Sequence, residues 1–134
     1  MAERFFTVEE ANALLELVRP LAEELVARRR ALADALARQE RIAGKVRSNG
    51  GGIRHDEPAE VDAALSAEAE AVARCVERIN ELGVLVKDLD LGLVDFPALR
   101  GGEEVLLCWH VGEDEIRYWH GLEEGFGGRK KLPL

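Results

Sequence analysis

The sequence predicts an α+β protein in which a long antiparallel α-hairpin is followed by a small antiparallel sheet of three or four strands. Residues 1–83 are rich in Ala, Leu, Glu and Arg, which favour helices. Residues 84–134 are rich in Gly, Trp, Val and Asp, which favour strands and turns. Because 134 residues is the usual length of one domain, we expect a single domain over 1–134, with a helical part at 1–83 and a β part at 84–134.

The first helix is expected to begin at a capping box, in which Thr7 and Glu10 satisfy each other's backbone N–H groups. The helix can run to about Val46. Pro20 inside it predicts a kink or a break, because proline removes a backbone donor. The apolar residues recur at steps of three and four, as in a helix that packs along one stripe: Leu14, Val18, Leu21, Leu25, Leu32, Ala35, Ile42 and Val46.

The second helix is expected to follow a glycine-rich break at 48–52, to begin near Pro58 and to end at Gly83, a favoured C-terminal cap. Two helices that are joined by a loop of roughly ten residues are expected to pack antiparallel. In the register that follows from this loop, Arg28 and Glu68 are not opposite each other.

Each helix also carries a second stripe of apolar or small residues. Either the β part covers these stripes or a second copy of the chain does, and from the width of the apolar surface we expect a homodimer. The residues of these stripes are Leu15, Ala22, Val26, Ala33 and Ala37 in the first helix, and Ala63, Ala64, Ala67 and Ala71 in the second.

Four segments of the β part have the composition of strands, namely 84–87, 91–96, 105–111 and 115–120. The turn at 112–114 predicts a hairpin that pairs Val111 with Ile116. In this register Trp109 and His120 share the more apolar face, which we expect to pack on the helices. Trp119 then lies on the outer face with Cys108.

Several side chains of the β part suggest a binding site. Cys108 and His110 alternate to the same face of a strand and together could bind a metal ion, although the pattern supplies no further ligand, so a buried cysteine beside a half-exposed histidine is the alternative. Asp88 either contributes a carboxylate to a site or caps a turn. Asp95 interrupts an apolar strand and so points to a functional or ion-paired carboxylate.

The glycine-rich basic segment at 125–131 offers an anion site, in which Arg129 and nearby backbone amides hold the anion while Glu113 or Asp95 holds a metal ion or water. The alternative is a tail that crosses the sheet. The ligand-binding candidates are therefore Asp88, Asp95, Glu113, Trp119, His120 and Arg129.

The composition excludes several classes of protein. A net charge of −8 disfavours nucleic acid and anionic membranes as partners. We expect no membrane-spanning segment and no secretory signal, and two cysteines fit a reducing, cytoplasmic setting. The chain lacks the Gly-x-Ser-x-Gly, Cys-x-x-Cys, His-Glu-x-x-His and dinucleotide-binding motifs.

These exclusions favour a non-catalytic, homodimeric binding or assembly module without a cofactor. The alternative is a protein that binds a divalent metal or a small anionic ligand on its C-terminal sheet, with hydrolysis as its catalytic form. The sequence does not decide whether the protein is an enzyme.

The C-terminal half resembles a small bacterial family catalogued as domain of unknown function 2203. The resemblance rests on the string VKDLDLGLVDFPA at 86–98 and on the opening FTVEEAN at 6–12, followed by the short motifs LCW, GE, WH and GF in the last third of the chain. It implies a short bacterial protein with helices first and signature strands last, and no established activity. The recurrent residues that it implies are Asp88, Asp95, Cys108, Trp109, Glu113, Trp119, His120, Gly125, Phe126 and Arg129.

Overall fold

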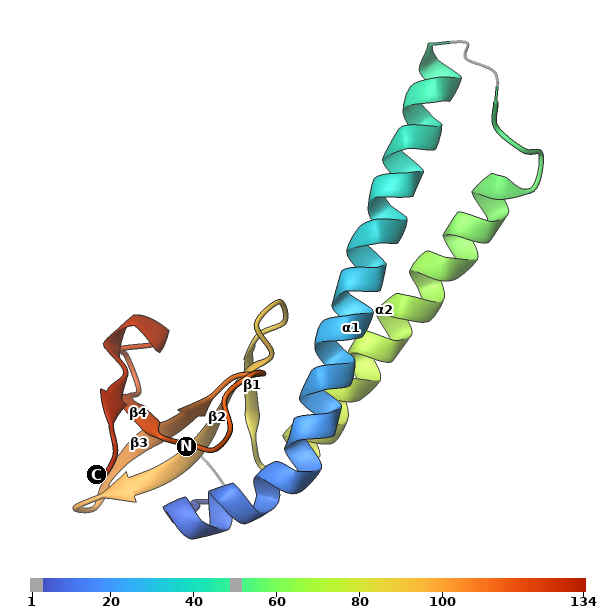
Figure 1. The fold of residues 1–134 in the computed structure, drawn as a ribbon. Coiled ribbons are helices and arrows are strands. Elements are labelled where there is room, and N and C mark those ends of the chain that lie inside the picture. The colour runs from blue at the N-terminus through green and yellow to red at the C-terminus, as the bar shows by residue number, and fades with distance from the viewer. Residues whose placement is uncertain (1–3, 49–51) are drawn as a thin grey trace.

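The computed structural model describes residues 4–48 and 52–134, and it confirms the predicted α+β fold. Two helices, α1 (Val8–Arg47) and α2 (Glu57–Glu81), form an antiparallel hairpin beside one end of an antiparallel sheet (Figure 1). The strands follow chain order: β1 (Leu85–Asp88), β2 (Leu93–Arg100), β3 (Glu103–Trp109), β4 (Tyr118–Gly121) and β5 (Lys130–Lys131), with the short helix η1 (Phe126–Gly128) before the last.

The sheet has more strands than the three or four predicted, because the two-residue β5 pairs with β4 in a segment expected to be a tail. The glycine-rich break expected between the helices lies, for residues 49–51, outside the described part of the chain. Neither of the two described helices contains a stretch that is both long and apolar enough to span a bilayer.

The start of α1 is as predicted, and of the kink or break predicted at Pro20 the structure shows no break. The Thr7 hydroxyl accepts the Glu10 N–H at 3.1 Å, and the Glu10 carboxylate accepts the Thr7 N–H at 2.9 Å. Pro20 lies inside one uninterrupted helix, which curves in its first third (Figure 1). Val18 and Ala22 on either side of it are fully buried, so packing keeps these turns helical despite the lost donor.

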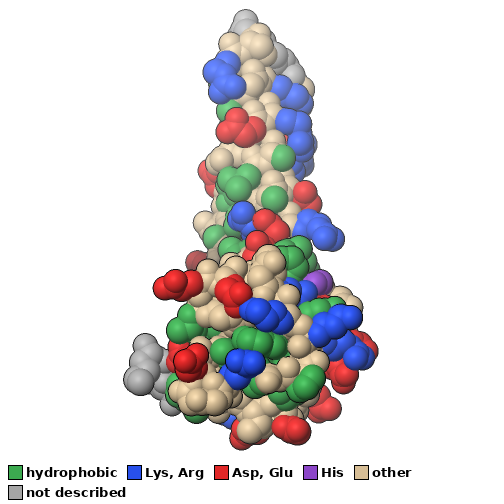
Figure 2. All heavy atoms as spheres, turned by 90° about the vertical axis from the view of Figure 1, so that its left-hand side faces the viewer, with side chains coloured by type: hydrophobic (Ala, Val, Ile, Leu, Met, Phe, Trp, Pro, Cys, Tyr) green, Lys and Arg blue, Asp and Glu red, His purple; other side chains and the backbone are tan. Residues whose placement is uncertain are grey.

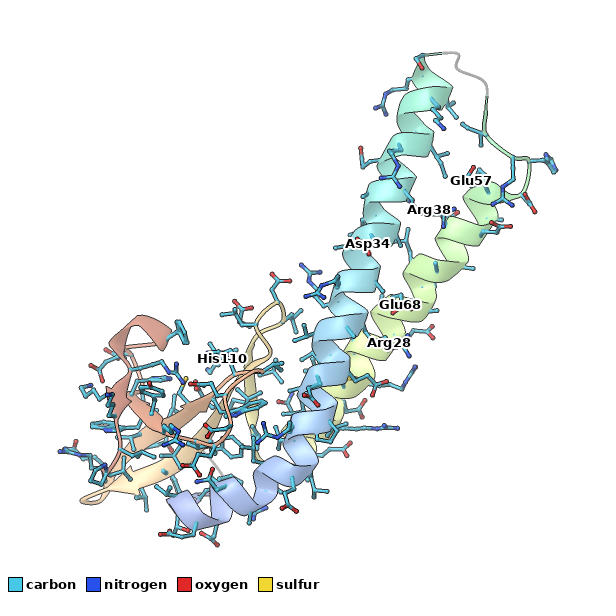
Figure 3. All side chains as sticks on the ribbon, viewed as in Figure 1. Arg28, Asp34, Arg38, Glu57, Glu68 and His110 are labelled. Atoms are coloured by element: carbon cyan, nitrogen blue, oxygen red, sulfur yellow. The ribbon has the colours of Figure 1, made fainter. Side chains whose placement is uncertain are left out.

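The second helix begins as expected, with Pro58 in its first turn, and ends at Glu81, where Leu82 is the C-cap and Gly83 follows in the left-handed conformation. The expectation that Arg28 and Glu68 do not meet is wrong. Their side chains approach to 3.4 Å between Nη1 and Oε1 (Figure 3), and Arg38 pairs with Glu57 at 3.3 Å, so the two helices pack in a register that differs from the expected one.

The hydrophobic core lies between the lower part of the hairpin and one face of the sheet. It includes Phe96, Leu107 and Trp109 from the strands, all fully buried, and it also takes in Leu15 and Ala22 from the second stripe of α1. The β part therefore covers the lower end of that stripe. Ala33 and Ala37, farther along α1, are exposed.

The hairpin of β3 and β4 has a different register from the predicted one. Leu107 pairs with Trp119, one residue away from the expected pairing. Val111 and Ile116 are not cross-strand partners, because β3 already ends at Trp109 and the Ile116 N–H bonds instead to the Asn12 side chain of α1 at 2.8 Å.

A shift of one residue turns every side chain of a strand to the other face of its sheet. Trp119 is therefore on the core face, 9% exposed, rather than on the outer face. His120 is on the outer face rather than on the core face, because it pairs with Leu106.

Candidate functional site

The outer face of the sheet, which points away from the core, carries an unusual row of polar side chains. Asp95 of β2 pairs with Cys108 of β3, which in turn pairs with Tyr118 of β4. His120 lies two residues farther along β4 and so on the same face. Alternation along three adjacent strands thus brings Asp95, Cys108 and His120 together, a group that we call the Asp95 cluster.

The Asp95 cluster is buried and tightly arranged. Asp95 is 1% exposed, Cys108 0% and His120 3%. His120 Nε2 lies 3.2 Å from Asp95 Oδ1, and the ligand atoms of the three side chains all lie within 4.8 Å of one another. A buried carboxylate needs a partner that offsets its desolvation, and His120 is that partner.

The orientation of the His120 ring is set by the backbone. Nδ1 lies 2.7 Å from the Gly121 carbonyl oxygen. A carbonyl can only accept, so Nδ1 carries the hydrogen and donates it. Nε2 is then the atom directed at Asp95.

The Asp95 cluster does not provide a reactive thiolate. Burial raises the pKa of Cys108 to about 12, and the neighbouring Asp95 acts in the same direction. Burial also raises the pKa of Asp95, against the opposing effects of His120 and Lys87. The thiol is therefore protonated at neutral pH, which argues against cysteine nucleophilic catalysis.

A pocket of about 240 Å³ opens over the Asp95 cluster. Its polar lining comes from Lys87, Asp88, Asp95 and His120, and its apolar walls include Leu106 and Phe126. The pocket joins β1, β2, β3 and β4 to the segment that follows β4. A small ligand seated there would contact Asp95 and His120 directly.

Asp88 at the edge of this pocket caps a turn, which is the alternative that the sequence allowed. Its Oδ1 accepts the backbone N–H groups of Asp90 at 2.8 Å and Leu91 at 2.9 Å. One carboxylate oxygen thus holds the loop between β1 and β2 while the residue also lines the pocket.

A second group, which we call the Arg129 cluster, consists of Arg129, Glu113 and His110. Arg129 Nη2 lies 2.6 Å from Glu113 Oε1, and the guanidinium stacks 4.1 Å from the Tyr118 ring centroid and 4.9 Å from that of Phe126. Glu113 thus forms a largely buried ion pair with Arg129, whereas the Arg129 Nε is buried without a hydrogen-bond partner among the described residues.

His110 belongs to the Arg129 cluster, whereas Cys108 groups with Asp95 and His120. Its backbone N–H donates to Glu113 Oε1 at 2.9 Å, and its Nδ1 bonds to the Val111 carbonyl at 2.8 Å. The predicted alternation fails here because β3 ends at Trp109, one residue earlier. The two clusters still touch, since Arg129 Nη2 donates to the Cys108 carbonyl at 3.3 Å.

Trp119 is the site candidate whose observed position differs most from the predicted one. It lies on the core face, where Arg100 and Lys130 cover its ring at 5.0 and 4.6 Å from the centroid. It does not line the pocket over the Asp95 cluster. The error has one cause, the register of β4.

The structure brings together Asp88, Asp95 and His120 from the predicted site, and it adds Cys108 with new partners. Lys87 lines the pocket but was not among the candidates. The sequence could have indicated Lys87, because this residue immediately precedes Asp88 at the end of β1, the strand that pairs with β2 and thus with the strand of Asp95.

A family model described as "Uncharacterized conserved protein (DUF2203)" matches residues 4–132, which is nearly the whole chain. No curated protein matches the chain, and no solved structure matches it.

Proposed function

We propose that this chain, which belongs to the uncharacterised DUF2203 family, is an assembly module that forms a homodimer through the part of its hairpin that extends beyond the sheet. We call this part the distal hairpin and define it as residues 28–47 of α1 and 57–70 of α2. The observation that carries the proposal is the combination of exposed apolar side chains and opposite charges on its two helices.

The distal hairpin rises as a narrow column above the broader sheet end of the molecule (Figures 1 and 2). Leu36 is 45% exposed and Val46 is 67% exposed on this column. The neighbouring Ala33 and Ala37 are exposed as well. Such side chains on an isolated two-helix column favour a partner that removes them from water.

The two helices of the distal hairpin carry opposite charge. Residues 28–47 contain seven basic and two acidic residues, and residues 57–70 contain five acidic and no basic residues. Basic side chains gather along the upper column in Figure 2, where α1 faces the viewer. Arg38 and Glu57 pair across the hairpin at 3.3 Å, whereas Arg41, Lys45 and Glu70 make no ion pair with another described residue.

A second copy of the chain complements this arrangement. A two-fold axis parallel to the hairpin places α1 of one copy against α2 of the other, with the two loops at the same end. Each basic helix then lies beside an acidic helix, and all neighbouring helices are antiparallel, as in a four-helix bundle. The charge pattern thus favours a second copy over an unrelated partner.

Sedimentation equilibrium at micromolar concentration tests this proposal. We expect the wild-type chain to be a dimer, and Leu36→Glu to shift it toward monomer because the new carboxylate would be buried without a partner. Leu99→Glu is the matched control, since Leu99 is 48% exposed but lies on the sheet. A wild-type chain that stays monomeric, or equal effects of both variants, would disprove the proposal.

A second candidate function is the binding of a small ligand in the pocket over the Asp95 cluster. The pocket's volume and its few convergent polar groups support it. Chemical-shift mapping of the amides of β2 and β4 during titration with small carboxylates and inorganic phosphate tests it directly. Shifts confined to the pocket would support the proposal, and the absence of any saturable shift with either probe would contradict it.

We also propose a cytoplasmic location. The two cysteines, Cys75 and Cys108, are both free and buried. Unpaired buried thiols fit a reducing compartment. Fractionation of cells that express the chain, with marker proteins for each compartment, is the measurement that checks this.

A further inference from the structure

We infer that Asp95, Cys108 and His120 form a binding site for a single divalent metal ion of the zinc type. The ion would be held by one carboxylate oxygen, one sulfur and the Nε2 atom of the imidazole. The inference rests on the second candidate function, because the pocket over these residues is the route by which an ion or its ligand reaches them.

The ligand set and its spacing suit tetrahedral zinc. Bonds of about 2.0–2.3 Å place tetrahedral ligand atoms about 3.3–3.8 Å apart. His120 Nε2 and Asp95 Oδ1 are 3.2 Å apart, and all three ligand atoms fall within 4.8 Å of one another. Small side-chain rotations therefore complete three corners of the tetrahedron. Sulfur and imidazole nitrogen favour zinc over magnesium or calcium, which prefer oxygen.

His120 already has the support of a metal ligand. Histidines that bind metals donate their other ring N–H to a carbonyl or carboxylate, which fixes the ring. His120 Nδ1 makes this bond to the Gly121 carbonyl at 2.7 Å. Nε2 is consequently the only ring nitrogen available to an ion, and it points at the other two ligands.

The charges also balance. One carboxylate and one thiolate cancel the two positive charges of the ion, so that the occupied site is neutral and avoids the cost of a buried net charge. The nearby Lys87 lines the pocket at its edge, and Arg129 is already neutralised by Glu113 at 2.6 Å. The ion would displace the proton of the thiol.

The fourth position of the ion faces the pocket. Asp95 and His120 line the pocket, whereas Cys108 lies beneath it and is fully buried. Three protein ligands plus one open position are typical of zinc sites that bind water or a substrate, rather than of closed structural sites. The site would therefore accept water or an oxygen donor.

Titration of the metal-free chain, purified without a histidine tag, with Co²⁺ tests the inference. We expect one equivalent to bind and to give the d–d bands of tetrahedral cobalt together with a thiolate-to-cobalt charge-transfer band. Cys108→Ser should abolish the charge-transfer band, and His120→Gln should weaken cobalt binding at least tenfold. Cys75→Ser and His110→Gln are the matched controls and should leave both signals intact.

A wild-type chain that binds no cobalt, or a charge-transfer band that survives in Cys108→Ser, would overturn the inference. If Cys108→Ser does not fold, X-ray absorption of the zinc-loaded wild type decides, because one sulfur per zinc is expected and none would refute the site. Cobalt binding is measured without any added ligand. A failed ligand titration of the pocket is therefore distinguishable from a failed metal site.

Discussion

His120 Nε2 and Asp95 Oδ1 lie 3.2 Å apart although β3 separates the strands that carry them. The two side chains reach over Cys108 and meet above it, so that the carboxylate of β2 and the imidazole of β4 connect strands that share no backbone hydrogen bond. Both side chains are nearly completely buried, and Asp95 is the hydrogen-bond partner of His120 Nε2.

Removal of the Asp95 carboxylate should therefore cost stability. Asp95→Ala leaves His120 Nε2 buried without a partner, and we expect a loss of about 1–3 kcal/mol in the free energy of unfolding. Asp95→Asn retains a hydrogen-bonding group of the same shape and should lose clearly less. Urea denaturation of both variants measures the difference. Equal losses would mean that the contact itself contributes little.

The two tryptophans should contribute similarly to stability. Trp109 and Trp119 share the core face and are 0% and 9% exposed. Each truncation to alanine is expected to lose about 3–5 kcal/mol, as large core truncations do. Leu99→Ala on the same sheet is the control and should lose far less, because Leu99 is 48% exposed. A much smaller loss for Trp119→Ala than for Trp109→Ala would contradict the observed register of β4.

Gly92 is expected to be the glycine least tolerant of substitution. It has φ +64°, and a Cβ atom there would lie 2.5 Å from Val111 Cγ2 and 2.8 Å from Val26 Cγ2. Gly92→Ala should lose about 1–2 kcal/mol from its left-handed backbone and about 1–3 kcal/mol more from overpacking.

The matched control for this prediction is Gly101→Ala. Gly101 has φ +57°, and an added Cβ would meet no atom within 4 Å. The control should therefore show only the loss that comes from the backbone. Thermal unfolding of the two variants compares them. Identical melting temperatures would indicate that Gly92 does not pack closely against Val26 of α1.

Asp114 gives a prediction about pH. Arg117 donates to both of its carboxylate oxygens, at 3.1 and 2.9 Å, and holds the pKa of Asp114 at about 2. Because the folded pKa is below the unfolded one, the contribution to stability is complete above about pH 4 and is lost as the pH falls toward 2.

NMR titration of the Asp114 carboxyl carbon should show this low pKa directly. Arg117→Gln should raise it toward its ordinary value, because the charged donor is lost. A pKa that does not change in the variant would show that the backbone around Glu115, rather than Arg117, holds it low.

The helical half of the fold was predictable because its signals are local. Thr7 and Glu10 are three residues apart, and Pro58 and Gly83 mark helix ends through their own backbone preferences. The pairing of Arg28 with Glu68 was missed because the register expected from the loop differs from the one in which Arg28 meets Glu68 and Arg38 meets Glu57.

The residues of the site could be predicted from the sequence, but their arrangement could not. Asp95 and His120 were identified by residue type and position in a strand. Their meeting depends on the register of β4, which the bond from Ile116 to Asn12 of α1 helps to fix. No pattern within the β part reports a contact made by a helix about a hundred residues earlier, so a shift of one residue exchanged the faces of Trp119 and His120.

The single helix α1 passes through two environments, since its first half is packed on the core and its second half stands clear of the sheet (Figure 1). Amide hydrogen exchange should therefore divide one continuous helix into two kinetic segments. Amides near Val18 would exchange only through global unfolding, whereas amides near Ile42 would exchange through local fraying from the loop end. Protection of that outer segment would in turn serve as a sensitive, residue-resolved reporter of any partner that docks there.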